Sequence, residues 1–556
     1  MGRYLLACTI AVLTLALFPC SALSQSAPAF QLGFKALADQ IPNIAGAPLE
    51  NEHYGANGDS LQQTSTGLMV WRKADNWTAF TNGSMTWVNG PYGVQERANE
   101  ERFNWEADDR NQSGQAGPEP TATTQSTPAA AIPSARSGYP RVNVHPGAEW
   151  AKAAIFWFGR ATEHDNYTDA RVYYDETALY VYLSVTDYYL WADLSGAADP
   201  RQFDAAALYL DTGATSGGPY LFVSGFRPYP VQNDARWHRQ ARLTSSGWDY
   251  SAGASSDWKD LIGLRYYKSG PNNNSDRDGG WATTFTIPWA ALGLAGPPSA
   301  GSPWGMGVRV YDRDEPPPAG LTGETHWPQA FSEANPASWG TLVFDPAQFV
   351  VSGPATGVTV IRRGLGSARV QDAYAGGGGN CQGGIFGDGD RPHPTDQLFV
   401  QNQSDIADFP CFSKSFLNFD LAGIPAGKKI VSATLTLHSF GGSDPSQAKP
   451  SQIQLLTVDE SWDESTLTWN NAPMARENVS VATVDVLKGF PGWPGVPFSW
   501  DATQAVAEAY AAGKSANLAL YSTDSAYHSG KYFVSSDTGD WNAEARPTLT
   551  VSWADK

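Results

Sequence analysis

The chain has 556 residues, too many for a single hydrophobic core, so its length predicts two to four domains. Its 56 acidic and 37 basic residues give a formal net charge of −19, and an acidic surface repels the phosphate backbone, which excludes nucleic acid as a partner. Hydrophobic residues make up 42% of the chain, which suits folded domains and is too little for a membrane protein.

Residues 1–24 have the pattern of a signal peptide. A positively charged start precedes an apolar run from Leu5 to Phe18, and residues 22–24 form a small-x-small cleavage site. The run is too short for a comfortable membrane span. A lipoprotein anchor on Cys20 is the alternative, but the residue before it is Pro19, where a small residue is needed. We therefore expect an exported, extracellular protein without an integral membrane segment.

A small module and a linker follow the signal peptide. Residues 28–106 contain short strand-like runs, Asn-Gly turns and regularly placed tryptophans, which predict a small β module of unknown role. Residues 107–140 are rich in Pro, Thr, Ser and Ala and hold almost no large apolar side chain. Such a segment cannot bury enough surface to offset its chain entropy, so we expect a semi-extended linker.

Residues 141–349 contain strand-like runs in a characteristic order: "YDETALYVYLSVTD", "FDAAALYLD", "GGWATTFTIPW" and "NPASWGTLVF". This order resembles the family 9 carbohydrate-binding modules, which implies a DOMON-like β-sandwich. Sugar-binding members carry a tryptophan where this chain has Arg201, a second one where it has "SEANPAS", and a glutamate at Thr284. The resemblance therefore implies a retained fold without the known sugar sandwich.

Three readings of this second module stay open. Its binding site could be shifted and built from Trp191, Trp237 or Tyr220 around Arg201, it could take a different ligand, or it could be purely structural.

Residues 361–554 form the last predicted module. Val431, Ala433, Leu435 and Leu437 alternate with polar residues, which predicts a half-buried strand, and "DATQAVAEAYAAGK" predicts the one clear helix. The motifs "KSFLNFDLAGIPAG", "SWDESTLTWNNAP" and "RPTLTVSW" closely resemble the DNRLRE domain, which is grouped with family 96 carbohydrate-binding modules. Some members bind the acidic polymer alginate, so the resemblance implies a polysaccharide partner, with an acidic polymer such as alginate as one candidate.

The segment "SWDESTLTWNNAP" holds candidate contacts for this partner. We predict a strand over residues 465–469 with Leu467 and Trp469 on its buried face, which leaves Trp462 as the candidate for stacking on a sugar ring. Lys414 occupies the position where the resembled family usually carries a basic residue. Its ammonium could meet a uronate carboxylate, or it could pair with a carboxylate inside the domain.

Calcium and a disulfide are the two remaining predictions at the level of single residues. Asn274, Asp276 and Asp278 have the spacing of the first half of an EF-hand loop, but Phe285 stands where that loop needs a glutamate, which favours a hairpin turn. Calcium therefore stays an open alternative there. Cys381 and Cys411 are the two cysteines that remain after signal removal, and in an exported protein they predict one disulfide.

The sequence favours an all-β protein of two tandem β-sandwiches and a small β module that binds carbohydrate without catalysis. Asp463 and Glu464 are neighbours and point to opposite faces of an extended chain, unlike the paired carboxylates of a glycosidase. An enzyme of the hydrolase or lyase class, an accessory subunit of one, or a structural adhesion protein are the alternatives. A haem-binding sandwich would need an axial pair, for which Met306 and His238 are the only candidates.

Overall fold

The computed structural model describes residues 28–98, 140–376 and 397–556. Within these ranges it leaves out positions 55–58, 73–76, 83–84, 91–92, 148–149, 151–152, 197, 214–218, 228–235, 251–257, 265–272, 274, 276, 318, 352, 403–411, 443–447, 459–461 and 524–528. The predicted signal peptide and residues 107–139 of the predicted linker lie outside the described residues. In the described ranges, no helix is long and apolar enough to span a membrane. The chain divides into two compact units, Met1–Ser126 and Thr127–Lys556.

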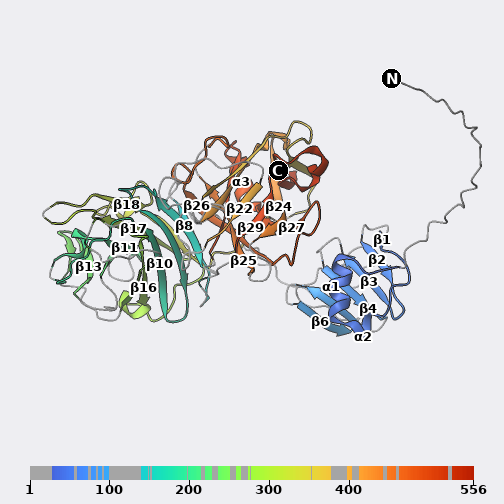
Figure 1. Cartoon of the computed structure of the whole chain (residues 1–556), viewed down its shortest axis with the longest axis horizontal. Helices are drawn as coiled ribbons and strands as arrows, with labels where there is room; N and C mark the ends of the chain where they lie inside the picture. Colours follow the sequence, from blue (N-terminus) through green and yellow to red (C-terminus); the bar gives the residue numbers. More distant parts are fainter. Residues whose placement is uncertain are drawn as a thin grey trace, which may run out of the picture. The chain divides into compact units, whose positions relative to one another are not determined.

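The first unit is a six-stranded antiparallel sheet in which each strand pairs with the next along the chain (Figure 1). Its strands are β1 (His53–Tyr54), β2 (Ser60–Gln63), β3 (Leu68–Arg72), β4 (Trp77–Thr81), β5 (Met85–Gly90) and β6 (Gly93–Ala98). Two helices, α1 (Leu32–Gln40) and α2 (Pro42–Ala45), join Met69, Phe80 and Trp87 in one core. The sequence pattern predicts only strands here, so both helices are a correction to it.

The second unit begins with a β-sandwich whose first layer is a five-stranded antiparallel sheet. In spatial order its strands are β15 (Lys259–Leu264), β16 (Trp281–Pro288), β10 (Ala178–Thr186), β9 (Tyr167–Tyr174) and β8 (Ala154–Gly159). Every residue of β9 is buried, because one face packs on the sandwich core and the other on the neighbouring sandwich.

The opposing layer is a sheet of 13 strands that runs through both sandwiches. Its part in the first sandwich contains, in spatial order, β14 (Gly247–Asp249), β13 (His238–Thr244), β12 (Tyr220–Gly225), β11 (Ala205–Asp211), β17 (Pro303–Asp312), β19 (Gly340–Phe344) and β7 (Arg141–Val144), with β18 (Gly323–Trp327) paired to β17. It continues with β26 (Ala475–Val484), β25 (Ser451–Val458), β28 (Ala516–Ser522), β23 (Ser413–Phe419) and β21 (Val370–Gly376).

A six-stranded sheet closes the second, C-terminal sandwich. It contains β20 (Gly357–Arg362), β30 (Thr548–Asp555), β24 (Lys428–Gly442), β29 (Lys531–Val534) and β22 (Gln397–Val400), with β27 (Val496–Asp501) paired to β24. Short 3-10 turns lie at Pro200–Gln202, Trp289–Leu292, Pro336–Ser338, Leu421–Gly423 and Asp540–Ala545. The predicted helix is present as α3 (Thr503–Ala511). The described architecture confirms the all-β prediction with two sandwiches in tandem.

The two sandwiches share one continuous sheet, and side chains of both form one hydrophobic core. At the junction, the side-chain amide of Asn478 accepts a hydrogen bond from the backbone N–H of Asn143 at 2.8 Å and donates one to its carbonyl at 2.8 Å. Two further amides make the same exchange with backbone of the first sandwich, Asn470 with Ala161 and Gln454 with Ala153 and Ile155. The predicted boundary between residues 349 and 361 therefore lies inside a single compact unit.

Two local predictions in the C-terminal sandwich need correction. Residues 465–469 form no strand but lie in and between two turns, because Asp463 accepts a hydrogen bond from the backbone N–H of Ser465 and Asn471 accepts one from that of Thr468. In β24 the buried positions alternate from Ala433 onward as predicted, but a register shift between Ile430 and Ser432 leaves Val431 half-buried.

Candidate functional site

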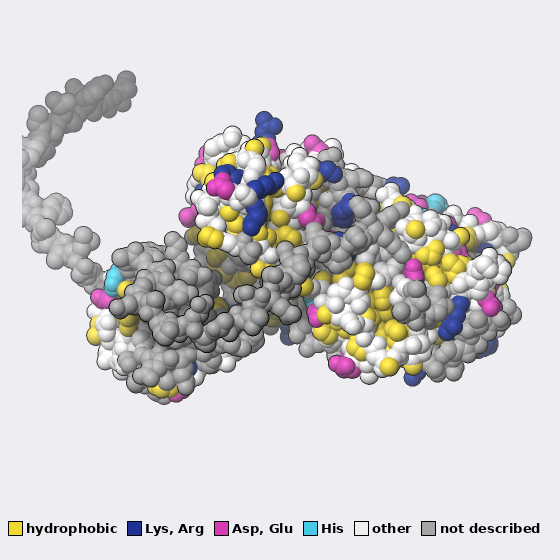
Figure 2. Space-filling view, turned by 180° about the vertical axis from the view of Figure 1, so that it is seen from behind, with side chains coloured by type: hydrophobic (Ala, Val, Ile, Leu, Met, Phe, Trp, Pro, Cys, Tyr) yellow, Lys and Arg dark blue, Asp and Glu magenta, His cyan; other side chains and the backbone are white. Residues whose placement is uncertain are grey.

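Three large aromatic side chains lie exposed on the C-terminal sandwich. The side chains of Phe490, Trp493 and Trp541 are 61%, 48% and 68% exposed. The ring centroid of Trp493 lies 5.0 Å from that of Phe490 and 5.3 Å from that of Trp541. We call these three residues the aromatic platform. On the face that Figure 2 shows, hydrophobic side chains lie among charged and polar ones and also gather in patches. A contiguous group of exposed rings is therefore a candidate contact surface.

Inner rings support the platform from below. Phe440 lies 5.6 Å from Trp493 and 6.2 Å from Tyr532, and Tyr532 stacks on the buried Phe399 at 4.5 Å. Phe440 occupies a register shift between Ser439 and Gly441, where β24 pairs with β29. A bulge of this kind re-aims a side chain. A continuous series of ring contacts thus leads from the buried Phe399 to the exposed Trp493, and these contacts hold the Trp493 indole in place.

Glycines hold the two tryptophans in place. Trp493 lies in a turn closed by the hydrogen bond from the Gly495 N–H to the Gly492 carbonyl at 3.0 Å. Both glycines have positive φ, 81° and 97°, a region that side chains disfavour. Trp541 follows Gly539, where any Cβ would come within 2.8 Å of the indole. The loop "PGWPG" therefore presents an indole that belongs to no strand.

The charged side chains near the platform are two acidic and two basic residues. Asp540 precedes Trp541, has a side chain that is 95% exposed and forms an ion pair with Arg546 at 2.8 Å. Glu544 is also exposed, and the exposed Lys488 comes two residues before Phe490. A neutral sugar ring would meet no desolvated charge at this surface.

Lys414, a predicted carbohydrate contact, is fully buried between the two sandwiches. Its Nζ lies 3.8 Å from the ring centroid of Trp469, 4.2 Å from Trp157 and 4.8 Å from Tyr167, and it donates a hydrogen bond to the Tyr167 hydroxyl at 3.0 Å. Tyr521 lies on a further side at 5.4 Å. This position is incompatible with a polymer contact, so we do not retain Lys414 as one.

The environment of Lys414 is a hydrogen-bonded network with one carboxylate. Asp169 accepts hydrogen bonds from the hydroxyls of Tyr167 and Tyr521 and from the side chain of Asn402. Burial lowers the pKa of Lys414 to about 7, against the opposing attraction of the Asp169 carboxylate. The residue that the sequence offered as a ligand contact therefore lies in the junction between the sandwiches.

Trp462 and the turn that follows it lie at the same junction. Trp462 is partly buried, packs against the shared core and lies 6.1 Å from the ring of Phe416. Leu467 and Trp469 are buried, as predicted. Glu464 accepts a hydrogen bond from the backbone N–H of Asp372 at 3.3 Å. The contacts of Trp462 and Glu464 are thus made with other residues of the protein. Neither of the neighbouring carboxylates, Asp463 and Glu464, is buried.

The two tryptophans among the candidate residues of the first sandwich are also enclosed by protein. Trp191 and Trp237 are 8% and 3% exposed, and the indole N–H of Trp237 donates to the Asp193 carbonyl at 2.9 Å. Arg201 forms an ion pair with Asp199 at 2.7 Å and lies over the ring of Tyr250. Neither indole presents a ring face to a polymer, so these residues no longer support a shifted sugar site.

The remaining predictions fall partly outside the described residues. Asn274, Asp276, Cys381 and Cys411 lie outside them. Asp278 is buried, and its carboxylate accepts a hydrogen bond from the backbone N–H of Leu190 at 3.1 Å. His238, offered as a haem ligand, lies with its Nε2 2.5 Å from Oδ1 of Asp260.

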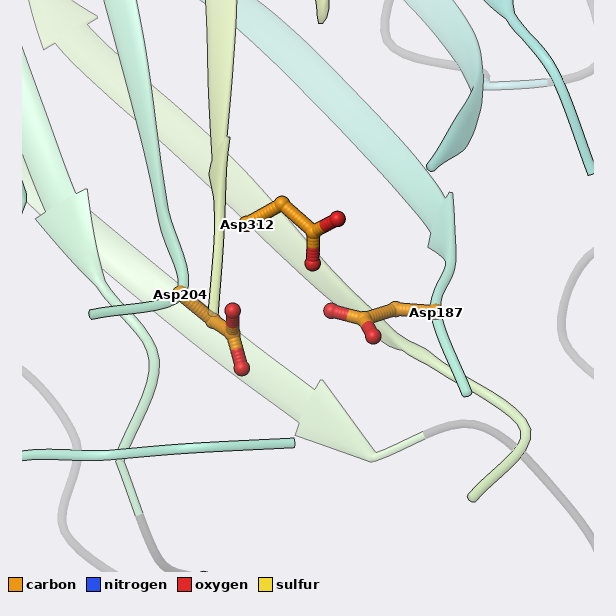
Figure 3. Close-up of side chains that lie close together, drawn as sticks. All are labelled: Asp187, Asp204 and Asp312. Atoms are coloured by element: carbon orange, nitrogen blue, oxygen red, sulfur yellow. The ribbon is translucent and has the colours of Figure 1, made fainter. Parts of the chain in front are cut away.

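A cluster of three carboxylates was not predicted from the sequence. Asp187, Asp204 and Asp312 each offer an oxygen, and these oxygens lie within 4.8 Å of one another (Figure 3). The side chains are 1%, 0% and 2% exposed. Burial, together with the neighbouring carboxylates, raises the pKa of Asp312 to about 8 and the pKa values of Asp187 and Asp204 well above their usual range.

Comparison with known proteins identifies one part of the chain. Residues 393–552 match the model of carbohydrate-binding module family 96. The sequence-based prediction of a family 96 module is therefore confirmed over these residues, and the aromatic platform lies within them. No curated protein matches the chain.

Several solved structures resemble part of the chain. They include a family 9 carbohydrate-binding module from Caldicellulosiruptor kristjanssonii in complex with cellotriose, at 15% identity over 38% of this chain and 100% of that one, with a TM-score of 0.26. The same module in complex with glucose matches at 14% identity over the same shares, with a TM-score of 0.26. A putative carbohydrate-binding protein from Bacteroides uniformis matches at 14% identity over 34% of this chain and 85% of that one, with a TM-score of 0.25.

Proposed function

We propose that the protein is an exported, non-catalytic carbohydrate-binding protein that attaches to polysaccharide through the aromatic platform. The observation that carries this proposal is the cluster of exposed rings formed by Phe490, Trp493 and Trp541 inside the region that matches family 96. Indole faces stack on the apolar faces of pyranose rings and bury a large area at low conformational cost.

The surroundings of the platform support a neutral polymer as the preferred ligand. Asp540 and Glu544 lie within three residues of Trp541, but Arg546 pairs with Asp540, so the surroundings supply no net positive charge that would attract uronate carboxylates. Lys414, the cation on which the alginate prediction rested, is buried. Alginate therefore becomes the weaker candidate, and xylan or β-glucan the stronger.

Affinity electrophoresis of the full chain in native gels tests this proposal. The gels contain alginate, pectin, xylan or β-glucan, and the variants are Trp493→Ala, Trp541→Ala and the double variant. Each lost ring should weaken binding by about 0.5–1.5 kcal/mol, and the double variant, with a loss of about 1–3 kcal/mol, should be retarded least. Trp493→Phe keeps a ring and should retain most of the retardation.

Val481→Ala is the matched control, because Val481 is 53% exposed on β26 of the same sandwich and lies outside the platform. It should bind like the unchanged protein. The proposal is wrong if none of the polymers retards the unchanged protein, or if the double variant is retarded as strongly as the control.

A further inference from the structure

The three rings of the aromatic platform stand at steep angles to one another. The planes of Trp493 and Trp541 meet at 80°, and those of Phe490 and Trp493 meet at 72°. Both pairs are edge-to-face contacts, in which the edge of one ring lies against the face of the other. Trp493, which belongs to both pairs, is the less exposed of the two indoles. The platform therefore offers ring faces that point in different directions and do not share one plane.

The direction of each indole is set by its immediate surroundings. A Cβ at Gly539 would lie 2.8 Å from Cδ1 and 2.9 Å from Nε1 of Trp541, so the pyrrole edge of this indole packs against the backbone. Gly539 has φ −61° and ψ 160°, a conformation that any residue adopts, so a glycine is needed here for space and not for its backbone angles. The Trp493 indole packs on Phe440, whose ring is inclined to it by 42°.

A flat ligand cannot stack on both indoles at the same time. The face of a crystalline polysaccharide such as cellulose presents its sugar rings in one plane, so several aromatic rings can stack on it only when they are coplanar. Because the two indoles meet at 80°, a flat face that stacks on Trp493 meets only the edge of Trp541, or the reverse. One of the two exposed rings would then gain no stacking contact, and binding would be no stronger than at a single tryptophan.

A chain that turns along its own axis can meet both indoles. Xylan and laminarin are β-linked glycans with helical chains, so their successive sugar rings face in different directions. Two indole faces at 80° to each other can each stack on a different sugar of one such chain. A chain that is already helical in solution has this shape before it binds and loses little conformational entropy on binding.

We propose that the aromatic platform binds single polysaccharide chains with a helical twist, such as xylan or laminarin, in preference to flat crystalline cellulose. This inference rests on the proposed function, because it requires that the platform binds carbohydrate. It goes further in naming the shape of the polymer. The feature that determines this preference is the angle between Trp493 and Trp541, and the space that Gly539 leaves for the second indole maintains that angle.

Native gels and sedimentation with the full chain test this preference. Xylan or laminarin in the gel should retard the unchanged protein, whereas microcrystalline cellulose should leave it in the supernatant. Gly539→Ala tests the angle without removing a ring, because the added methyl group displaces the exposed Trp541 indole. This variant should bind xylan or laminarin about 2- to 10-fold more weakly, as after the loss of one stacked ring, and should keep its melting temperature.

Gly489→Ala is the matched control, because Gly489 precedes Phe490, its φ is not positive, and a Cβ there would have no atom within 4 Å. It should bind like the unchanged protein. Equal retardation of Gly539→Ala and Gly489→Ala would overturn this inference and leave the proposed function intact. Sedimentation with cellulose that the double variant Trp493→Ala/Trp541→Ala abolishes would do the same.

The comparison of polymers decides the question even if Gly539→Ala does not fold. An unchanged protein that neither xylan nor laminarin retards would overturn the inference. The proposed function falls with it only if alginate, pectin and cellulose also fail to bind the unchanged protein.

Discussion

Two aromatic clusters of the C-terminal sandwich differ in what surrounds them. At the junction, Trp469 and Tyr521 join Trp157 and Tyr167 of the first sandwich to enclose Lys414. We call these four rings the aromatic cage. The platform is instead exposed and borders on surface carboxylates. Trp469, in the motif that resembles the known family, therefore lies between the sandwiches, whereas Trp493 and Trp541, outside that motif, face solvent.

The cage also accounts for the single compact unit. A buried ammonium is costly unless it is paired or packed on ring faces, and the four rings with the Tyr167 hydroxyl fulfil this need only when both sandwiches are present. Cutting the chain between the sandwiches would expose the cage. Polysaccharide binding should therefore be measured with the full chain and not with a separated sandwich.

The largest expected effect is that of Trp469→Ala in the cage. The indole of Trp469 is 3% exposed and lies 4.8 Å from the ring of Tyr167, so its removal leaves a cavity at the junction. We expect the free energy of unfolding to fall by about 3–5 kcal/mol, measured by urea denaturation of the full chain. A change below about 1 kcal/mol would show that the cage does not hold the junction together.

Lys414→Met should change how stability depends on pH. Burial lowers the pKa of Lys414 to about 7, so between this pH and its ordinary pKa of about 10.4 the unfolded chain binds one proton more than the folded chain. The free energy of unfolding should therefore rise across this window and lie lowest below pH 7, where the folded protein holds the buried charge.

The Met variant lacks this titration. It should be more stable than the unchanged protein at pH 6, by about 1–4 kcal/mol, and the difference should shrink toward pH 10. Subtracting the two melting profiles removes the contributions of other groups. A difference that is constant from pH 6 to pH 10 would show that Lys414 keeps its proton in the folded state.

A smaller effect is expected for Asn478→Ala at the sheet junction. The substitution leaves the N–H and carbonyl of Asn143 without their two partners at 2.8 Å. We expect a loss of about 1–3 kcal/mol in urea denaturation. Asn471→Ala is a useful comparison, because Asn471 bonds within its own turn and not across the junction. Equal losses would contradict a special role for the amide exchange.

The sequence predicts the strands well wherever burial alternates, as in β24 from Ala433 onward. It misses α1, although Phe34, Leu37, Ala38 and Ile41 have the spacing of one helical face. The strand expected at residues 465–469 fails because short side-chain hydrogen bonds compete with extended backbone.

The sites depend on contacts that local patterns do not contain. Lys414 lies beside Tyr167, a residue 247 positions away, and the three carboxylates come from separate strands. One part of the platform has a signal in the local sequence. In "PGWPG" a tryptophan lies between glycines and prolines, a composition that is typical of an exposed loop and not of a strand.

The platform variants should change stability least. Trp493→Ala and Trp541→Ala remove exposed rings, so each should shift the free energy of unfolding by about 0.5 kcal/mol or less. The same substitutions should weaken polysaccharide binding, which separates the platform from the cage.

Oxidation of tryptophans by N-bromosuccinimide, with mass spectrometry of peptides, tests the central claim most directly. In the full chain without ligand, Trp493 and Trp541 should be oxidised first, and Trp157 and Trp469 should stay unreactive. A bound oligosaccharide from the polymer that retards the protein should protect Trp493 and Trp541. Unchanged oxidation of both residues in the saturated complex, with protection of other tryptophans, would contradict the assignment of the binding surface.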